Sequence, residues 1–201
     1  MTIRTFTDLG KIGIIKDVQP QELPTNAWSD GINIRFKDGG VERMKGELQV
    51  FATPSTIPYW LQPYYQGGKR YWIHAGLNAV YADDGTTRTT ITPSTAPTGA
   101  IDDRWTGGVL NGILVANNSK DIPWYWNGTG LMLALPGWDA TWRAASVRPF
   151  KNFLVALDMT KGANRFRHMV KWSDAAVPGA VPASWDITDK TKLAGELEIA
   201  E

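Results

Sequence analysis

The fold is decided by residues 67–92, which read GGKRYWIHAGLNAVYADDGTTRTTIT. Three short runs rich in aromatic and β-branched residues, 71–74, 79–81 and 89–92, are separated by Gly-containing turns. This spacing is typical of antiparallel strands, because an Asp-Gly pair such as Asp84-Gly85 tolerates the positive φ angles of tight hairpin turns. We therefore predict a three-stranded meander in this stretch.

The composition favours an all-β chain. Among its 201 residues are ten Trp, 20 Gly and 12 Pro, and Gly or Pro interrupts nearly every window in which a helical period could develop. The net charge of +1 implies no bulk attraction to nucleic acid or to an anionic membrane. The absence of Cys excludes disulfides and thiol nucleophiles. The longest apolar runs, 131–135 and 153–157, are far shorter than a membrane span, so we expect no stable membrane insertion.

Similar segments recur at a spacing of about 40 residues. The first two begin with a Gly pair, and each of the three precedes a run that carries an aromatic residue. The segments are 67–75, 107–116 and 149–156, and the aromatic runs are 80–81, 124–126 and 170–172. A period of this length with several short strands is typical of β-propeller blades. The alternative is a β-sandwich whose hairpins merely resemble one another.

We expect the repeats at about 58–98, 99–140 and 141–190, within a region 46–201. Three blades do not close a ring, since propellers have about four to eight. The predicted fold is therefore a set of β-propeller-like antiparallel meander blades in an incomplete ring. Residues 192–201 alternate polar and apolar side chains, which predicts a final strand that ends without a partner and a truncated chain.

The first 45 residues do not contain the recurring segment. Residues 32–37 and 41–44 flank Asp38-Gly39-Gly40 and predict a β-hairpin, preceded by an extended N-terminal arm. Extended segments of this kind are typical of contacts with a neighbouring subunit. We take Trp28, Arg35 and Phe36 as the candidate residues for that contact.

Catalytic and metal-binding patterns are not recognised in the sequence. His74 and His168 lack a second ligand at metal-binding spacing, and adjacent carboxylates such as Asp102 and Asp103 point to opposite faces of a strand unless a turn intervenes. We therefore expect no enzyme activity and no cofactor. Asp83-Asp84-Gly85 is interpreted as a turn.

Two groups of side chains are candidates for binding. Trp124, Trp126 and Trp172 either stack on a ligand such as a sugar ring or pack between blades. Residues 143–172 hold seven basic residues and one acidic residue, and they either meet phosphate or an acidic neighbour, or pair with the acidic tail 173–201. The basic residues are Arg143, Arg148, Lys151, Lys161, Arg165, Arg167 and Lys171.

Several stretches resemble one family of proteins. They are GIIKDV (13–18), ELPTNAWSDGINIRF (22–36), residues 105–117, RPFKNFLVAL (148–157) and MVKWSD (169–174). The chain is similar to virion structural proteins of short-tailed bacteriophages and related prophages, in the tail-nozzle or tail tubular protein B group. The resemblance covers nearly the whole chain, and its most specific parts are residues 22–36 and 148–157.

This resemblance implies a structural subunit of the phage tail, assembled in the bacterial cytoplasm. Members form a ring, commonly a hexamer, below the portal and the tail adaptor, and the ring is part of the channel for genome ejection. The expected partners are further copies of the chain, the adaptor or other virion proteins, and genomic DNA through non-specific contacts. The alternative function is a carbohydrate-binding or host-receptor-binding β-module that uses exposed tryptophans.

Overall fold

The computed structural model describes residue 5 and residues 7–199. The chain divides into two compact units, residues 1–49 and 50–201. The fold is all-β, and the only helical element among the described residues is a single 3-10 turn, η1 (Pro20–Glu22). In the described part of the chain, no helix has the length and apolar character that crossing a membrane requires.

The first unit contains two small strand pairs. β1 (Gly13–Ile14) runs parallel to β2 (Ala27–Trp28), and β3 (Ile34–Lys37) pairs antiparallel with β4 (Gly40–Arg43). The turn between β3 and β4 is formed by Asp38 and Gly39, whose φ angles of 51° and 77° are those that an Asp-Gly hairpin turn requires. The predicted hairpin is confirmed.

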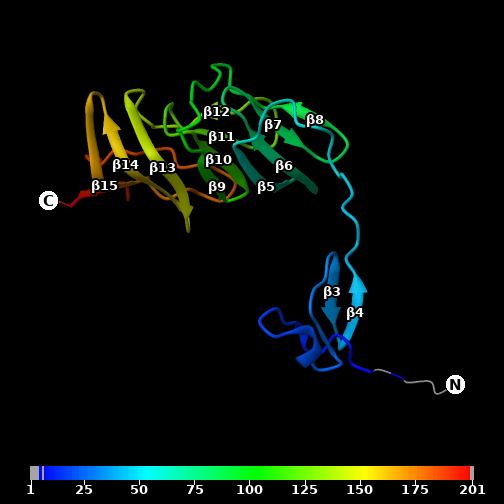
Figure 1. The fold of residues 1–201 in the computed structure, drawn as a ribbon. Coiled ribbons are helices and arrows are strands. Elements are labelled where there is room, and N and C mark those ends of the chain that lie inside the picture. The colour runs from blue at the N-terminus through cyan, green and yellow to red at the C-terminus, as the bar shows by residue number, and fades with distance from the viewer. Residues whose placement is uncertain (1–4, 6, 200–201) are drawn as a thin grey trace. The chain divides into compact units, whose positions relative to one another are not determined.

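The second unit consists of three four-stranded antiparallel sheets, each formed by four strands that are consecutive in the sequence (Figure 1). The first sheet contains β5 (Trp60–Gln66), β6 (Lys69–Ala75), β7 (Val80–Asp83) and β8 (Arg88–Thr90). The second contains β9 (Thr106–Leu110), β10 (Ile113–Asn117), β11 (Trp124–Trp126) and β12 (Leu133–Ala134). The third contains β13 (Trp142–Phe150), β14 (Phe153–Lys161), β15 (Asn164–Trp172) and β16 (Gly195–Glu198). The meander expected within residues 67–92 is confirmed.

The first hairpin turns of the first two sheets show that the segments 67–75 and 107–116 are not equivalent residue by residue. Gly67 and Gly68 form the β5–β6 turn, with φ angles of 58° and 78°. The equivalent β9–β10 turn is formed by Asn111 and Gly112, with φ angles of 51° and 82°, whereas the Gly107-Gly108 pair lies inside β9. Both turns need residues that tolerate positive φ, and Asn meets this need as well as Gly.

In the third sheet, the third of the similar segments, residues 149–156, contains a turn. They end β13, turn at Lys151-Asn152 and begin β14, so that Phe150 pairs with Phe153. The turn lacks Gly, and Lys151 itself adopts a φ of 53°. A turn that contains neither Gly nor Pro leaves no hairpin signal in the sequence.

The final strand also differs from its prediction, because β16 does have a partner. It pairs antiparallel with β15, with Leu197 opposite Val170 and Glu196 opposite Lys171. A connection of 22 residues, 173–194, separates the two strands and includes the fully buried Trp185. A pairing across so long a connection leaves no local signal in the sequence, since hairpin signals come from short turns.

The three sheets stack face to face, and the second sheet is buried on both sides. On β10, Leu114 and Ala116 belong to the apolar cluster shared with the first sheet, whereas Val115 between them belongs to the cluster shared with the third sheet. Successive strand residues point to opposite faces, so this alternation places one sheet on each side. Strand β10 is consequently a continuous apolar run.

The first strands of the three sheets lie side by side, β5 next to β9 and β9 next to β13. Close approach of β9 to β13 depends on Gly108, because a Cβ atom there would lie only 2.9 Å from Cγ of Pro149. Two buried hydrogen bonds join β13 to strands β10 and β9 of the second sheet. The Asn117 amide donates to the carbonyl oxygen of Ala144 at 3.0 Å, and the Val147 amide donates to Oγ1 of Thr106 at 3.1 Å.

Candidate functional site: a charged cavity between the second and third sheets

A cavity of about 750 Å³ opens where loops of the second sheet meet the start of the third sheet. Charged side chains of both signs line it. They come from the loop before β9, from the β10–β11 loop and from strands β13, β14 and β15: Asp102, Asp103, Arg104, Lys120, Arg143, Asp158 and Arg165. A pocket of this size and polarity fits a polar or charged group of a ligand or a neighbouring protein.

Arg143 holds the wall of the cavity together. Its guanidinium donates to the carbonyl oxygens of Lys120 and Ala140, both at 2.8 Å, and of Trp142 at 2.6 Å. The three acceptors are neutral carbonyl oxygens, so these hydrogen bonds fix the side chain without neutralising its positive charge. The Lys120 and Arg104 side chains are exposed at the rim. The cavity therefore offers cationic groups to a phosphate or carboxylate.

Asp158 and Arg165 form a tight pair on the other wall. Nε of Arg165 lies 2.8 Å from one carboxylate oxygen and Nη2 lies 2.6 Å from the other. The hydrogen bond from Arg165 lowers the pKa of Asp158 from its usual range, and the opposing effect of burial is smaller. Asp158 sits at an irregularity in the β14–β15 pairing with a φ of 53°, which turns its side chain toward Arg165.

The seven basic residues predicted as one surface lie in different places. Arg143 and Arg165 line the cavity, and Arg167 is exposed on β15. At the opposite end of β13, Arg148 donates to the carbonyl oxygen of Gly107, and Lys151 lies 5.7 Å from the Phe150 ring. Strand direction explains the separation, because the two ends of a nine-residue strand lie roughly 25 Å apart.

Lys171 is not a surface residue, and this part of the prediction is wrong. Its side chain is 1% exposed and donates to the Glu196 carboxylate at 2.9 Å, beside Lys161, which donates to the same oxygen at 2.6 Å. Lys171 points to the buried face of the third sheet, because it lies opposite Ala156 of β14, and Ala156 is on that face. For these two lysines, the alternative of pairing with the acidic tail is confirmed.

The tryptophans predicted as a stacking platform are mostly buried. Trp124 and Trp126 are each 4% exposed and pack against the first sheet, with the Trp126 ring 5.4 Å from that of Tyr64. Packing between sheets is confirmed for these two residues, so they present no ring to a ligand. Trp172 is half-buried on the outer face of the third sheet, where Nε1 donates to the carbonyl oxygen of Leu193 at 2.9 Å.

The candidate residues of the N-terminal unit contact one another or other residues of that unit. The Trp28 and Phe36 rings lie 6.4 Å apart, and Nε1 of Trp28 donates to the carbonyl oxygen of Leu9 at 2.6 Å. The exposed Arg35 donates through Nε to Glu42 at 2.7 Å. These contacts stabilise the β3–β4 hairpin, and the role of the three residues between subunits stays a prediction.

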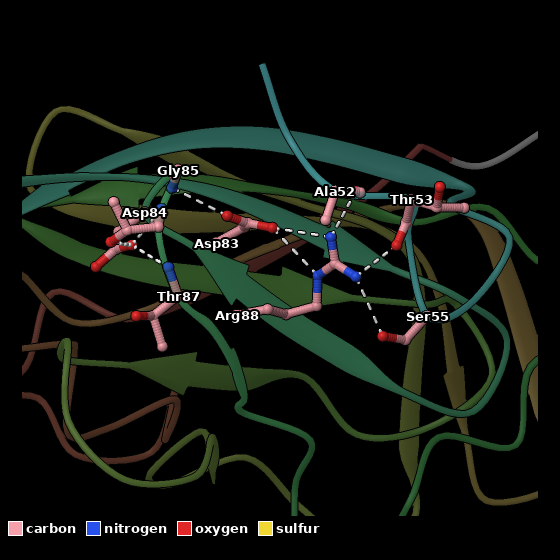
Figure 2. A network of polar contacts seen from close by, with 9 residues as sticks. Ala52, Thr53, Ser55, Asp83, Asp84, Gly85, Thr87 and Arg88 are labelled. Carbon is pink, nitrogen blue, oxygen red and sulfur yellow. Dashed lines mark hydrogen bonds and ion pairs between the residues drawn. The ribbon is translucent and has the colours of Figure 1, made fainter. Parts of the chain in front are cut away.

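A second polar group, which the sequence did not reveal, fastens residues 50–58 to the first sheet (Figure 2). Arg88 donates to Asp83 through Nε and Nη2, and to the carbonyl oxygens of Ala52 and Thr53, both at 2.7 Å. The buried Asp83 also accepts the Gly85 amide at 3.0 Å. The predicted turn is present after β7, where Gly85 has a φ of 90° and Asp84 accepts the amides of Thr86 and Thr87.

We expect Arg88→Ala to release residues 50–58 from the sheet. The variant loses charge-assisted hydrogen bonds, each worth roughly 1.5 to 3 kcal/mol, and leaves the Asp83 carboxylate unpaired. Limited proteolysis with chymotrypsin, followed by mass spectrometry, then shows faster cleavage at Phe51 than in the native chain. Arg70→Ala, which removes an exposed arginine of β6, is the control. Equal cleavage rates in the two variants would contradict the anchoring role.

His74 lies next to this group and is buried on β6. Its ring stacks on Tyr81 at 5.3 Å, and Nε2 has no hydrogen-bond partner among the described residues. Burial is the main cause that lowers the pKa of His74, and the nearby Arg88 charge lowers it further. The ring lies on the face of β6 opposite to the core residues Ile73 and Ala75, and it is buried there with Nε2 unsatisfied.

Asp121 joins two loops next to the charged cavity. Its carboxylate accepts the Thr98 amide and hydroxyl, both at 2.7 Å, and the Asn118 amide at 2.8 Å. Burial raises the pKa of Asp121, but the hydrogen bonds from Thr98 and Asn118 outweigh it, and the net shift is downward. A lowered folded-state pKa stabilises the fold above the unfolded value of about 3.9, and this stability is lost as the pH falls.

We therefore expect Asp121→Asn to lower stability at pH 7 and to flatten the loss of stability below about pH 4. Urea unfolding measured at a series of pH values tests both effects. Asp102→Asn, at an exposed aspartate that lines the cavity, is the matched control. If both variants change the pH profile equally, Asp121 does not have the stabilising role described here.

Among the described residues, no group of three or more His, Asp or Glu side chains is placed to hold a metal ion. No protein-family model matches the chain, and no curated protein matches it either.

Proposed function

We propose that the chain is a structural subunit of a phage virion, in the tail nozzle that forms part of the channel for genome ejection. The observation that carries this proposal is the stack of three successive four-stranded meanders whose first strands lie side by side. It is supported by the resemblance of residues 22–36 and 148–157 to tail-nozzle proteins. The proposed role is structural and not enzymatic.

The stack is best explained as part of a β-propeller. Propeller blades are four-stranded antiparallel meanders arranged around a central channel. The described sheets have that strand order, and β5, β9 and β13 are adjacent in the way that innermost strands are. Three sheets are fewer than the four to eight of a propeller, so the proposal includes further sheets beyond the three described.

The physical basis of the role is rigidity combined with local positive charge. Other sheets pack on both faces of the second sheet, and the buried hydrogen bonds of Asn117 and Thr106 hold β13 against it. A rigid wall keeps a channel open during passage of a stiff polymer. Arg104, Lys120 and Arg143 supply cationic groups for non-specific contact with phosphates or with an acidic neighbouring protein.

Immunogold labelling of virions tests the proposal directly. Antibodies raised against the purified chain are expected to label the tail just below the portal in particles produced by the prophage or phage that encodes it. Antibodies absorbed with the purified chain are the control. Virions that are complete and infectious but carry no label, and no peptide of the chain by mass spectrometry, would contradict a virion role.

The structure removes the main support for the alternative function, a glycan-binding module. Its two principal residues, Trp124 and Trp126, lie between sheets with 4% of their surface exposed. A sugar ring stacks on an accessible aromatic face, and neither residue offers one.

A further inference from the structure

Residues 50–58, the strap, cross the first sheet from one edge to the other. Arg88 of the edge strand β8 donates to the carbonyl oxygens of Ala52 and Thr53 (Figure 2). The chain then enters β5 at Trp60, and β5 is the strand at the opposite edge. Between these two points the strap passes over β7 and β6, the two central strands.

Two contacts with β6 and the turn after it mark the path of the strap. The Phe51 ring lies 6.4 Å from the Trp72 ring, edge to face. Thr56 packs against Gly76, where a Cβ atom would lie only 2.3 Å from its Oγ1. His74 lies between these two contacts and on the same face of β6 as Trp72, because alternate residues of a strand share a face. The imidazole is therefore beneath the strap.

The strap accounts for the burial of His74. Leu61, its partner on β5, is 60% exposed and Trp72 is 38% exposed, whereas His74 on the same face is 5% exposed. The Tyr81 ring stacks on one side of the imidazole. Strap residues line a hollow together with His74, namely Phe51, Ala52, Pro54 and Pro58. When the strap leaves the sheet, water therefore reaches the histidine.

Burial leaves one nitrogen of His74 without a partner. Nε2 has no hydrogen-bond partner among the described residues, so the hydrogen bond between the ring and the Trp72 backbone uses Nδ1. Protonation would place an N–H group and a positive charge at Nε2, where neither an acceptor nor water is within reach. A buried charge without a hydrogen-bond partner is strongly disfavoured, and an unpaired donor adds to the cost.

The ionisable neighbours of His74 do not compensate for a charge on the ring. They are Tyr81 and Asp83 on β7 and Arg88 on β8, whereas Leu61 and the strap residues carry no ionisable group. Asp83 favours the charged ring, but one of its oxygens accepts a backbone amide and the other accepts the Arg88 guanidinium. Burial and then the Arg88 charge lower the pKa of His74, and they outweigh the opposite effect of Asp83.

We propose that protonation of His74 releases the strap from the first sheet. The neutral ring is stable beneath the strap, and the charged ring is stable only when the strap lifts and water reaches Nε2. Because the pKa of His74 is lowered in the docked state, docking is favoured above the ordinary value of about 6.5 and is progressively lost as the pH falls below it.

Release of the strap changes the connection between the two compact units. The first unit ends at Gln49, immediately before the strap. The nine residues 50–58, once free, extend to about 30 Å, which lengthens the link by that reach. The switch is independent of the proposed tail-nozzle role, because it depends only on contacts within the first sheet and the strap.

Chymotrypsin cleavage of the Phe51–Ala52 bond, quantified by mass spectrometry from pH 7.5 to pH 5.5, tests the switch. A free peptide of residues 45–58, digested in parallel, corrects for the pH dependence of the protease. Relative to this peptide, cleavage of the native chain is expected to rise between threefold and tenfold. The upper limit is about tenfold over this range, because one proton binds to a group whose ordinary pKa is near 6.5.

Substitution of each histidine provides the control. His74→Phe keeps a ring on Tyr81 but takes up no proton, so we expect no rise. His168→Gln removes the exposed histidine of β15 and is expected to keep the native rise. Far-UV circular dichroism verifies that the variants are folded, and His74→Gln replaces His74→Phe if that variant is not.

Three results would overturn the proposal. The first is a rise of less than threefold in the native chain, and the second is an equal rise in His74→Phe. The third is a matching rise in cleavage at the buried Trp126, because this would indicate unfolding of the whole second unit and not release of the strap.

Discussion

We expect Glu196→Gln to lower the free energy of unfolding by about 3 kcal/mol, because it leaves Lys171 buried without an anionic partner. Glu196 accepts hydrogen bonds from both Lys161 and Lys171. Lys171 is 1% exposed, and its Nζ lies 4.6 Å from the centroid of the Trp142 ring. The value is at the lower end of the range for broken buried ion pairs, since the Glu196 side chain retains 22% exposure.

Guanidinium unfolding followed by circular dichroism measures this loss. The control is Glu198→Gln, at an exposed glutamate of the same strand. Lys171→Met, which removes the buried charge, is expected to recover part of the loss when combined with Glu196→Gln. Equal stability of the Glu196 and Glu198 variants would show that Lys171 does not depend on Glu196.

The same cluster makes the third sheet sensitive to acid. Burial raises the pKa of Glu196, but the hydrogen bonds from Lys161 and Lys171 outweigh it and the net shift is downward. The stabilisation is therefore complete above the unfolded value of about 4.3 and is lost as the pH falls through the lower folded value. Strand β16, which carries Glu196, is expected to detach first on acidification.

The second large effect is expected for Trp126→Ala, at about 3 to 5 kcal/mol. The Trp126 ring lies 5.4 Å from Tyr64 and 5.5 Å from Tyr71, both in the first sheet, so its removal opens a cavity between two sheets. Its Nε1 also donates to the carbonyl oxygen of Gly130 at 3.0 Å. Part of the loss comes from this hydrogen bond, whose acceptor is then unpaired.

Trp72→Ala is the matched comparison for this measurement. Trp72 is also a tryptophan of a central strand, but it lies on the outer face of the first sheet with 38% of its surface exposed. Its removal is expected to cost clearly less in denaturant unfolding, because less apolar surface returns to water. Equal losses would mean that the two sheets do not share the tightly packed core described here.

Local chemistry in the sequence was sufficient for the strands and their short turns. Asp38-Gly39 predicted a hairpin because few residues tolerate positive φ at both central positions. The apolar run of β10 predicted a strand, and the recurrence of aromatic strands predicted consecutive meanders. The turn at Lys151-Asn152 was not predicted, because it contains neither Gly nor an Asp-Gly or Asn-Gly pair.

The charged site required the tertiary structure. Arg143 and Arg165 were candidates because of their charge, but Arg104 and Lys120 come from another sheet's loops and carry no distinguishing motif. Lys171 and Trp124 had the right chemistry for a surface role and proved to be buried. Sequence periodicity tells which residues share a face of a strand, but it does not tell which face another sheet covers.

The sequence by itself thus determined the all-β class, the β3–β4 hairpin and the meander within residues 67–92, because these depend on φ preferences and on side-chain alternation between near neighbours. Only the tertiary structure decided that β16 returns to β15 and that the second sheet is buried on both faces. It also decided that Lys161 and Lys171 meet Glu196. These contacts join residues tens of positions apart, and the free energy that selects them comes from packing of whole sheets, which no short window of sequence contains.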